Sequence, residues 1–239
     1  MIALLLALAG PGLAAVPSPG ASPAPTPVPV LAPSAVIAKY AAAVAQVRDP
    51  RVFTVEYTLV QSGPRTLEQT HRIFRSGGDE RDETLAVNGT RSSTPVVRIF
   101  RGRPYRYTVA ALSPKPSAYE FTYAGPHRDG KHVDYVFDLT PKAVTAPALA
   151  FTQVTIDGVT FLPQTVSFTA SRQRGAGSVT FAKSEAFWVA RSATAQADVR
   201  GGVAHEQLRF SRWRFPKTLP RSTFDKPRPL LTPPPAVIP

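Results

Sequence analysis

The stretch from His132 to Lys142, HVDYVFDLTPK, decides the fold class of this chain. Every second residue from Val133 to Leu139 is a large apolar one (Val, Tyr, Phe, Leu), and a more polar set lies between them. A period of two predicts a strand with one apolar face and one more polar face. The proline at 141 ends this strand. The apolar face must contact the protein's own interior, a partner or a ligand.

The same alternation recurs along the chain. It is clear in VFTVEYTLVQ, residues 52–61, and further short strands are expected at 66–75, 82–88, 95–101, 104–110 and 119–125. Two-residue hairpin turns are expected at Asn88-Gly89, Asp129-Gly130, Asp157-Gly158 and Gly201-Gly202. Many strands joined by short turns, without alternating helices, indicate an antiparallel meander rather than a parallel sheet.

These turn positions also predict which residues face each other across the hairpins. The expected pairs are His127 with His132, Ile156 with Val159, Val154 with Phe161, Asp198 with His205, Ala195 with Leu208, and Ala193 with Phe210. The stripe of small residues at 193, 195, 197 and 199 would then lie beside bulky neighbours. Such a stripe leaves a groove that either the protein itself or a ligand must fill.

One amphipathic helix is expected before the strands. In SAVIAKYAAAVAQVRDP, apolar residues recur at three-and-four spacing, which predicts a helix from Ser34 to Arg48 with Ser34 as its N-cap. Asp49-Pro50 should end it.

The two ends of the chain differ from its middle in composition. Residues 1–15 are typical of a secretory signal peptide, although no Lys or Arg precedes the apolar run, so an apolar N-terminal anchor is the alternative. Residues 16–33 form a Pro/Ala-rich linker, and residues 225–239 a Pro-rich tail that we expect to be disordered. One β domain is expected at 34–224, in a periplasmic or secreted protein.

The chain is strongly basic, with 28 Lys and Arg against 16 Asp and Glu, a net charge of +12. An exported chain rarely meets nucleic acid, so anionic lipid, an envelope polymer or an acidic protein is the expected counterpart, unless the charge serves solubility alone. The sequence contains no cysteine, which excludes disulfides, thiol chemistry and a lipid-modified cysteine.

The order of these elements resembles the periplasmic lipoprotein-carrier family, the LolA/LolB-like fold. The matching pieces are Tyr135 to Pro141, Val154 to Phe168, Gly177 to Phe181, and Phe215-Pro216. The resemblance implies a mainly β fold, an unclosed half-barrel with the N-terminal helix on its concave face. It also implies binding of lipid or lipoprotein acyl chains in a cavity, by a carrier rather than an enzyme.

The predicted site follows from that resemblance and from the apolar strand faces. The residues expected to line a hydrophobic cavity are Phe53, Val55, Tyr57, Leu59, Tyr135, Phe137, Val166, Phe168, Phe181, Ala193, Ala195, Leu208 and Phe210. The residues expected to contact head groups at its rim are Arg101, Arg103, Arg212 and Arg214. The alternatives are an ordinary core for the first set and a solvated surface for the second.

Other chemistry has little support in the sequence. No G-x-S-x-G, P-loop or H-E-x-x-H motif occurs, and an enzyme would require titratable groups to converge from distant strands. His127, His132 and Asp134 could bind zinc, but Arg128 and Lys131 flank their turn and would repel a cation. We therefore expect no metal and no cofactor. A monomer is expected, and the alternative function is a protein-binding envelope-stress sensor.

Overall fold

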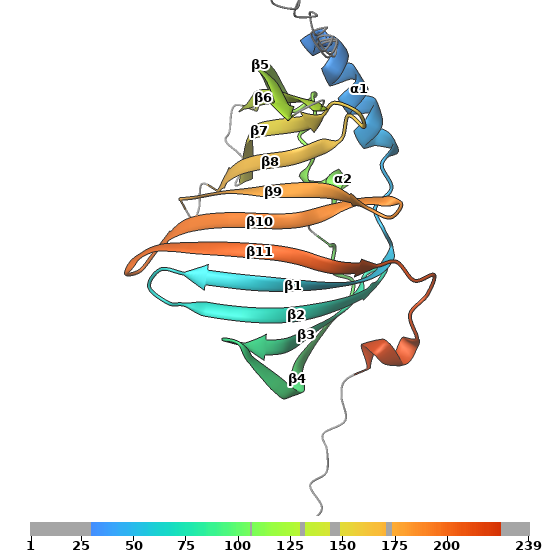
Figure 1. Ribbon diagram of the computed structural model, residues 1–239, viewed down its shortest axis with the longest axis vertical. Coiled ribbons are helices and arrows are strands. Elements are labelled where there is room, and N and C mark those ends of the chain that lie inside the picture. The colour runs from blue at the N-terminus through green and yellow to red at the C-terminus, as the bar shows by residue number, and fades with distance from the viewer. Residues whose placement is uncertain (1–29, 106, 130–131, 144–148, 171–173, 226–239) are drawn as a thin grey trace, which may run out of the picture.

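A computed structural model describes residues 30–105, 107–129, 132–143, 149–170 and 174–225 of the protein. These residues form one open antiparallel sheet with a helix at its N-terminal end (Figure 1). The strands are β1 (Val52–Ser62), β2 (Leu67–Ser76), β3 (Asp79–Val87), β4 (Thr90–Phe100), β5 (Tyr119–Asp129), β6 (His132–Pro141), β7 (Leu149–Asp157), β8 (Pro163–Ala170), β9 (Gly175–Ser184), β10 (Phe187–Val199) and β11 (Gly202–Arg214).

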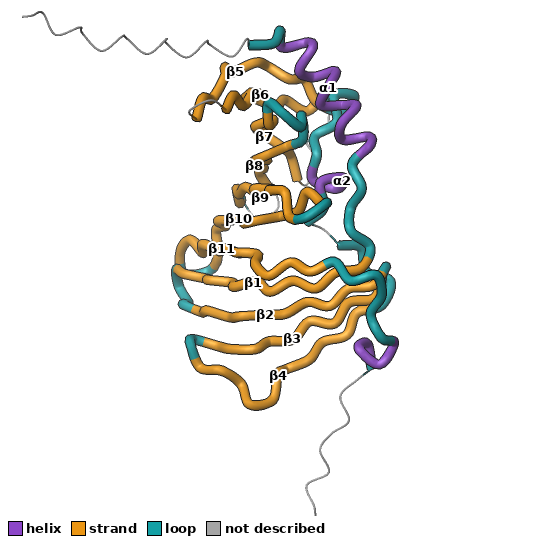
Figure 2. The backbone as a smooth tube through the Cα atoms, turned by 45° about the vertical axis from the view of Figure 1, so that its right-hand side comes forward, coloured by secondary structure: helices purple, strands orange, loops and turns teal. Residues whose placement is uncertain are grey.

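The order of strands in the sheet is β4-β3-β2-β1-β11-β10-β9-β8-β7-β6-β5. Two meanders, one on each side, are joined where β1 pairs with β11, so the first and the last strand lie side by side in the middle. β4 and β5 form the two edges and do not pair with each other, and the sheet curves without closing (Figure 2). The predicted unclosed antiparallel half-barrel is confirmed.

Helix α1 (Pro33–Gln46) lies next to the half of the sheet that ends in β5 (Figure 2). It begins one residue before the predicted start. Ala32 is the N-cap, so the expected Ser34 cap is wrong, and the proline at the first helical position needs no N–H partner there. It ends at Gln46 because Val47 is already extended. Within the described ranges, two shorter helices follow, α2 (Val109–Leu112) and the 3-10 helix η2 (Arg221–Phe224).

Tyr40 fixes α1 to the inside of the sheet. Its ring lies 5.9 Å from that of Phe121, and its hydroxyl donates a 2.9 Å hydrogen bond to the Pro114 carbonyl oxygen. We call the side of the sheet that α1 covers the inner face and the opposite side the outer face.

Removing this hydroxyl should weaken the fold measurably. We expect Tyr40→Phe to lower the free energy of unfolding by about 1–3 kcal/mol, because it leaves a buried carbonyl unsatisfied. Tyr123→Phe is the matched control, since the buried Tyr123 hydroxyl has no hydrogen-bond partner in the described part of the chain and its loss should cost nothing. Urea unfolding of both variants tests this, and an equal loss in both would contradict it.

The inner face carries the hydrophobic core. In β6, residues Val133, Tyr135, Phe137 and Leu139 are all buried, as their period of two predicts. They pack with Val36 and Tyr40 of α1 and with apolar residues of the neighbouring strands. The apolar face of the opening stretch therefore contacts the protein's own interior.

Two segments differ from the sequence prediction. The expected strand at 104–110 is wrong: the described residues there form a loop and the start of α2, and Thr108 caps that helix by accepting a hydrogen bond from Ala111 N. Strand β3 begins at Asp79 rather than at the predicted residue 82, so the acidic run from Asp79 to Glu83 lies within the strand. The turn precedes it at residues 77–78, where Gly77 has a φ of +58°.

The hairpin at Asn88-Gly89 forms as predicted, with Val87 opposite Thr90. The next hairpin is shifted, because Asp129 pairs with His132 and His127 therefore faces Asp134.

The last hairpin is shifted in the opposite sense, toward the N-terminus: Val199 pairs with Gly202 and Asp198 with Val203. Ala193 consequently faces Leu208, and Ala195 faces Glu206. The shift is by two residues, so the small residues stay on the predicted face of the sheet.

The loop between β7 and β8 is longer than a two-residue turn, since Ile156 pairs with Pro163 and Val154 with Val166. The Asp157 side chain explains the extra length. Its Oδ1 accepts hydrogen bonds from Val159 N, Thr160 N and Thr160 Oγ1, which stabilises a wider loop than the Asp-Gly pair implies.

Candidate functional site

The structure divides the predicted cavity residues into two groups. Seven of them are at most 6% exposed and belong to the packed core: Phe53, Val55, Tyr135, Phe137, Val166, Phe181 and Ala193. Phe210, at 8%, is almost as buried. Tyr57, Leu59, Phe168, Ala195 and Leu208 are only partly buried. The first group contacts other side chains of the chain, so any ligand must meet mainly the second.

The connection between β4 and β5 closes part of the inner face. We call the described part of residues 101–118 the crossing segment. The Tyr105 ring lies 5.0 Å from Phe53, the Tyr107 ring lies 5.3 Å from Phe210, and Val109 is completely buried. The middle of the half-barrel is therefore filled by the protein itself.

An opening remains beside the crossing segment, and we call it the aromatic hollow. It has a volume of about 270 Å³. Its lining combines apolar residues with four charged ones: Tyr57, Ile73, Phe100, Pro104, Tyr105, Tyr107, Leu208 and Phe210, together with Glu80, Asp82, Arg98 and Arg103. The floor comes from β11, β1, β2, β3 and β4, and the wall comes from the crossing segment.

Charged groups gather at this hollow, which the sequence analysis did not anticipate. His71 Nδ1 lies 2.8 Å from Asp82 Oδ1, and its ring stacks on Tyr57 at 4.7 Å. Arg75 pairs with Glu80 at 2.8 Å, and both side chains are buried. His71 and Arg75 lie two residues before and two residues after the apolar Ile73 in β2, so their side chains point to the same face as Ile73. This period of two was the signal in the sequence that could have placed both on the inner face. Because these groups pair with one another, the arrangement neutralises charge inside the half-barrel.

The tyrosines of the hollow stay uncharged. Burial raises the pKa of both Tyr57 and Tyr105 above the ordinary value for tyrosine. The Tyr105 hydroxyl is buried and has no hydrogen-bond partner among the described residues. The hollow therefore offers neutral aromatic surface and one donor that a bound acceptor could satisfy.

The predicted stripe of alanines does leave a groove, at the ends of β8–β11 on the inner face. We call it the small-residue groove, and its volume is about 320 Å³. Its lining is Gln61, Phe168, Ala170, Gly175, Ala176, Ala195, Gln196, Ala197, Asp198, Val199, Ala204 and Glu206. Glu206 accepts a hydrogen bond from Gln61 Nε2 at 3.3 Å, and most of the remaining lining is apolar and small.

The four predicted rim arginines are not brought together. Arg103 lines the aromatic hollow, whereas Arg101 donates to Asp79 Oδ2 and to the Phe224 carbonyl. Arg212 and Arg214 line a separate groove with Arg72, around Glu56. Arg72 and Arg212 each bond to a Glu56 carboxylate oxygen, so this cluster is partly neutralised.

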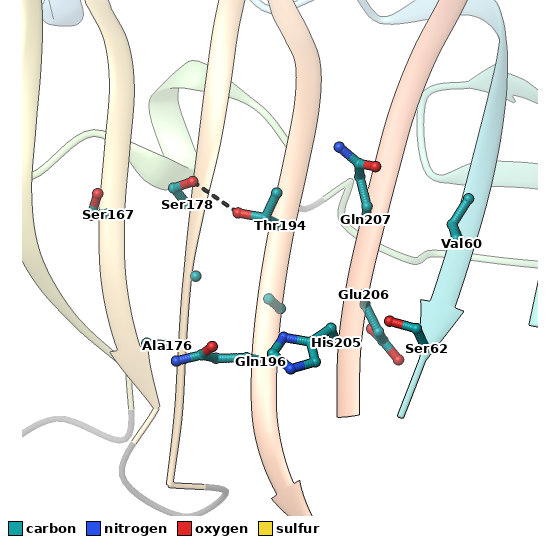
Figure 3. A pocket seen from close by; sticks show the side chains of 12 residues that line it. Val60, Ser62, Ser167, Ala176, Ser178, Thr194, Gln196, His205, Glu206 and Gln207 are labelled. Atoms are coloured by element: carbon teal, nitrogen blue, oxygen red, sulfur yellow. Dashed lines mark hydrogen bonds between the residues drawn. The ribbon is translucent and has the colours of Figure 1, made fainter. Parts of the chain in front are cut away.

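A larger depression of about 540 Å³ lies over β8–β11 and β1 (Figure 3). Ser167, Ser178, Thr194 and Gln207 occupy successive strands, and the Ser178 and Thr194 hydroxyls are 3.0 Å apart. Its lining therefore presents hydroxyl and amide groups beside apolar residues such as Val60 and Ala176.

The fold and the two inner-face openings define an open half-barrel with a partly filled interior. No protein-family model and no curated protein matches the sequence. Among solved structures, the chain is similar to a LolA superfamily protein from Nitrosomonas europaea, at 12% identity and a TM-score of 0.43, over 82% of this chain and 99% of that one.

Two further structures are similar at the same level. A DUF1329 family protein from Desulfovibrio piger is 12% identical with a TM-score of 0.46, over 80% of this chain and 96% of that one. An outer membrane lipoprotein-sorting protein domain from Vibrio parahaemolyticus is 14% identical with a TM-score of 0.43, over 79% of this chain and 95% of that one. All three TM-scores are below 0.5, so these similarities carry no conclusion about function.

Among the described residues, no helix has the length and apolar character needed to cross a membrane.

Proposed function

We propose that this protein is an exported, non-enzymatic cell-envelope protein that binds the acyl chain of a lipid or lipoprotein, as a carrier does. One observation supports this most: the inner face keeps two openings with apolar lining that neither α1 nor the crossing segment fills. The openings adjoin along β11. Leu208 lines the aromatic hollow, and Glu206 and Ala204, the next two inner positions, line the small-residue groove.

The two openings together match the needs of an acyl chain. From Leu208 to Ala204 the strand advances about 14 Å, which an extended hydrocarbon can follow. Each buried methylene contributes about 0.8 kcal/mol, so a dozen contribute about 10 kcal/mol before the cost of association. That is enough for useful affinity only if the chain occupies both openings.

The charges of the aromatic hollow favour an anionic head group there. Glu80 and Asp82 are already paired with Arg75 and His71. Arg103 is 3.9 Å from Glu80, and Arg98 is exposed and forms no ion pair within the described residues. A phosphate or carboxylate at this mouth would meet two cationic side chains and the buried Tyr105 hydroxyl.

The proposal predicts that filling the small-residue groove blocks binding. We expect Ala195→Phe to weaken the binding of a fluorescent fatty acid by about tenfold or more, because the ring occupies the space of several methylenes. Thr194→Phe is the matched control: it adds the same ring at the preceding residue of β10, which is exposed and lines neither inner-face opening, and it should change affinity by less than about twofold.

Native mass spectrometry of the unmodified protein, expressed with export to the periplasm, gives the independent test. Co-purified lipid is the expected result. A lipid-free protein in which both phenylalanine variants bind the probe as the unmodified chain does would contradict the proposal and favour the protein-binding alternative.

A further inference from the structure

We propose that His132, Asp134 and Asp157 form a binding site for a divalent transition-metal ion such as Zn²⁺, on the outer face of β6 and β7. His132 Nε2 lies 2.9 Å from Asp157 Oδ2 and 3.1 Å from Asp134 Oδ1. The three candidate ligand atoms all lie within 4.8 Å of one another. An imidazole nitrogen and carboxylate oxygens are the donors that zinc takes in proteins.

Asp134 provides the second, independent observation. Its side chain is only 4% exposed, and among the described residues its buried Oδ1 has no hydrogen bond, only the 3.1 Å ion-pair contact with His132 Nε2. A buried carboxylate is costly unless a charge or a set of hydrogen bonds compensates it, and an absent ion is one ordinary explanation for such an atom. The unsatisfied oxygen is the same atom that faces His132 Nε2.

Asp157 is oriented as metal-binding carboxylates usually are. The loop after β7 holds its Oδ1 with three hydrogen bonds, from Val159 N, Thr160 N and Thr160 Oγ1, while its Oδ2 faces His132. The oxygen directed at the site therefore belongs to a carboxylate that the loop holds in a fixed orientation.

The two separations that involve His132 fit a metal after a small adjustment. With metal–ligand bonds of about 2.1 Å, the ligand atoms of a tetrahedral site lie about 3.4 Å apart. The observed 2.9 and 3.1 Å separations must open by a few tenths of an ångström. His132 can supply this movement because its side chain is 39% exposed, whereas both carboxylates are buried.

A fourth ligand position is also available. His127 is directly opposite Asp134 across the β5–β6 pair, and directly opposed residues point to the same face with Cβ atoms about 4.5–5.5 Å apart. His127 is exposed, so either its imidazole or water can complete the coordination.

The repulsion expected from Arg128 is weaker than the sequence suggests. Arg128 pairs with Val133 and so points to the other face of the sheet. Lys131 lies outside the described residues.

Zinc titration by calorimetry tests this site on the full chain, prepared without a histidine tag. We expect about one zinc ion per chain, and Asp134→Asn and His132→Gln should each weaken binding by about tenfold or more. Asp138→Asn is the control, because Asp138 is exposed on the same face of β6. The zinc affinity of this variant should stay within about twofold of that of the unmodified chain.

Thermal unfolding gives a second measurement that does not depend on heats of binding. Zinc should raise the Tm of the unmodified chain and of Asp138→Asn, and a chelator should reverse the rise. If Asp134→Asn folds poorly, His132→Gln still tests the site, because the His132 side chain is substantially exposed and its replacement should not disturb folding. Absence of zinc binding, or binding equal in all four proteins, would overturn the site and leave a histidine–aspartate ion pair only.

Discussion

Glu80→Ala is expected to lower the free energy of unfolding by about 3–5 kcal/mol, because it leaves the Arg75 guanidinium buried without its counter-charge. The two groups are 2.8 Å apart, with side-chain exposures of 6% for Arg75 and 9% for Glu80. Arg75 also donates to the Arg103 carbonyl and lies over the Tyr105 ring, so an unpaired charge there would disturb the crossing segment as well. Equilibrium urea unfolding measures the loss.

Asp79→Ala is the matched control, one residue away on β3. Asp79 pairs with Arg101 at 2.6 Å, but these side chains are 41% and 56% exposed. Solvent screens such pairs, so the expected loss is below about 1 kcal/mol. The double variant Arg75→Met/Glu80→Leu should regain most of the stability lost in Glu80→Ala, since it removes both charges. Equal losses in Glu80→Ala and Asp79→Ala would contradict a buried pair.

Phe137→Ala should be equally damaging to stability and without direct effect on ligand binding. Phe137 is completely buried, and its ring contacts those of Phe121 and Tyr123 at 5.9 and 5.3 Å. Truncating such a ring costs about 3–5 kcal/mol. Val136→Ala is the control, because Val136 is only half-buried and lies on the outer face of the same strand. This change should lower the free energy of unfolding by about 1 kcal/mol or less.

This prediction separates core residues from ligand-binding ones among those that the sequence grouped together. The folded fraction of Phe137→Ala should bind the fluorescent fatty acid within about twofold of the unmodified chain, whereas Ala195→Phe should not. A large loss of affinity in folded Phe137→Ala would show that the hydrocarbon enters the part of the core around Phe137. In that case the two inner-face openings would not be the whole site.

The sequence predicts strands well wherever one face is apolar. The period of two in 52–61 and 132–141 fixes both the strands and the buried face, and the amphipathic segment after Pro33 fixes the helix. These features are local, so they can be read from neighbouring residues. The open sheet follows because every strand is joined to the next by a short connection except at the crossing segment.

The register of the hairpins and the residues of the candidate site could be predicted less well from the sequence, for physical reasons. Loop length after β7 depends on side-chain hydrogen bonds made by Asp157, which a two-residue turn motif does not reveal. The buried Arg75–Glu80 pair was missed because a charged residue is ordinarily expected to face water, and only its partner's position on β3 makes burial tolerable. The crossing segment fills the half-barrel through contacts between residues far apart in sequence.

The pairing of β1 with β11 has a consequence for how the chain is made. Glu56 and Ser211, joined by a hydrogen bond across this pair, are 155 residues apart, so the middle of the sheet can be completed only after synthesis of nearly the whole domain. Until then β1 presents an unpaired hydrogen-bonding edge, which invites association between nascent molecules. Closing so long a loop is slow, so a newly made chain is exposed to this association during that delay.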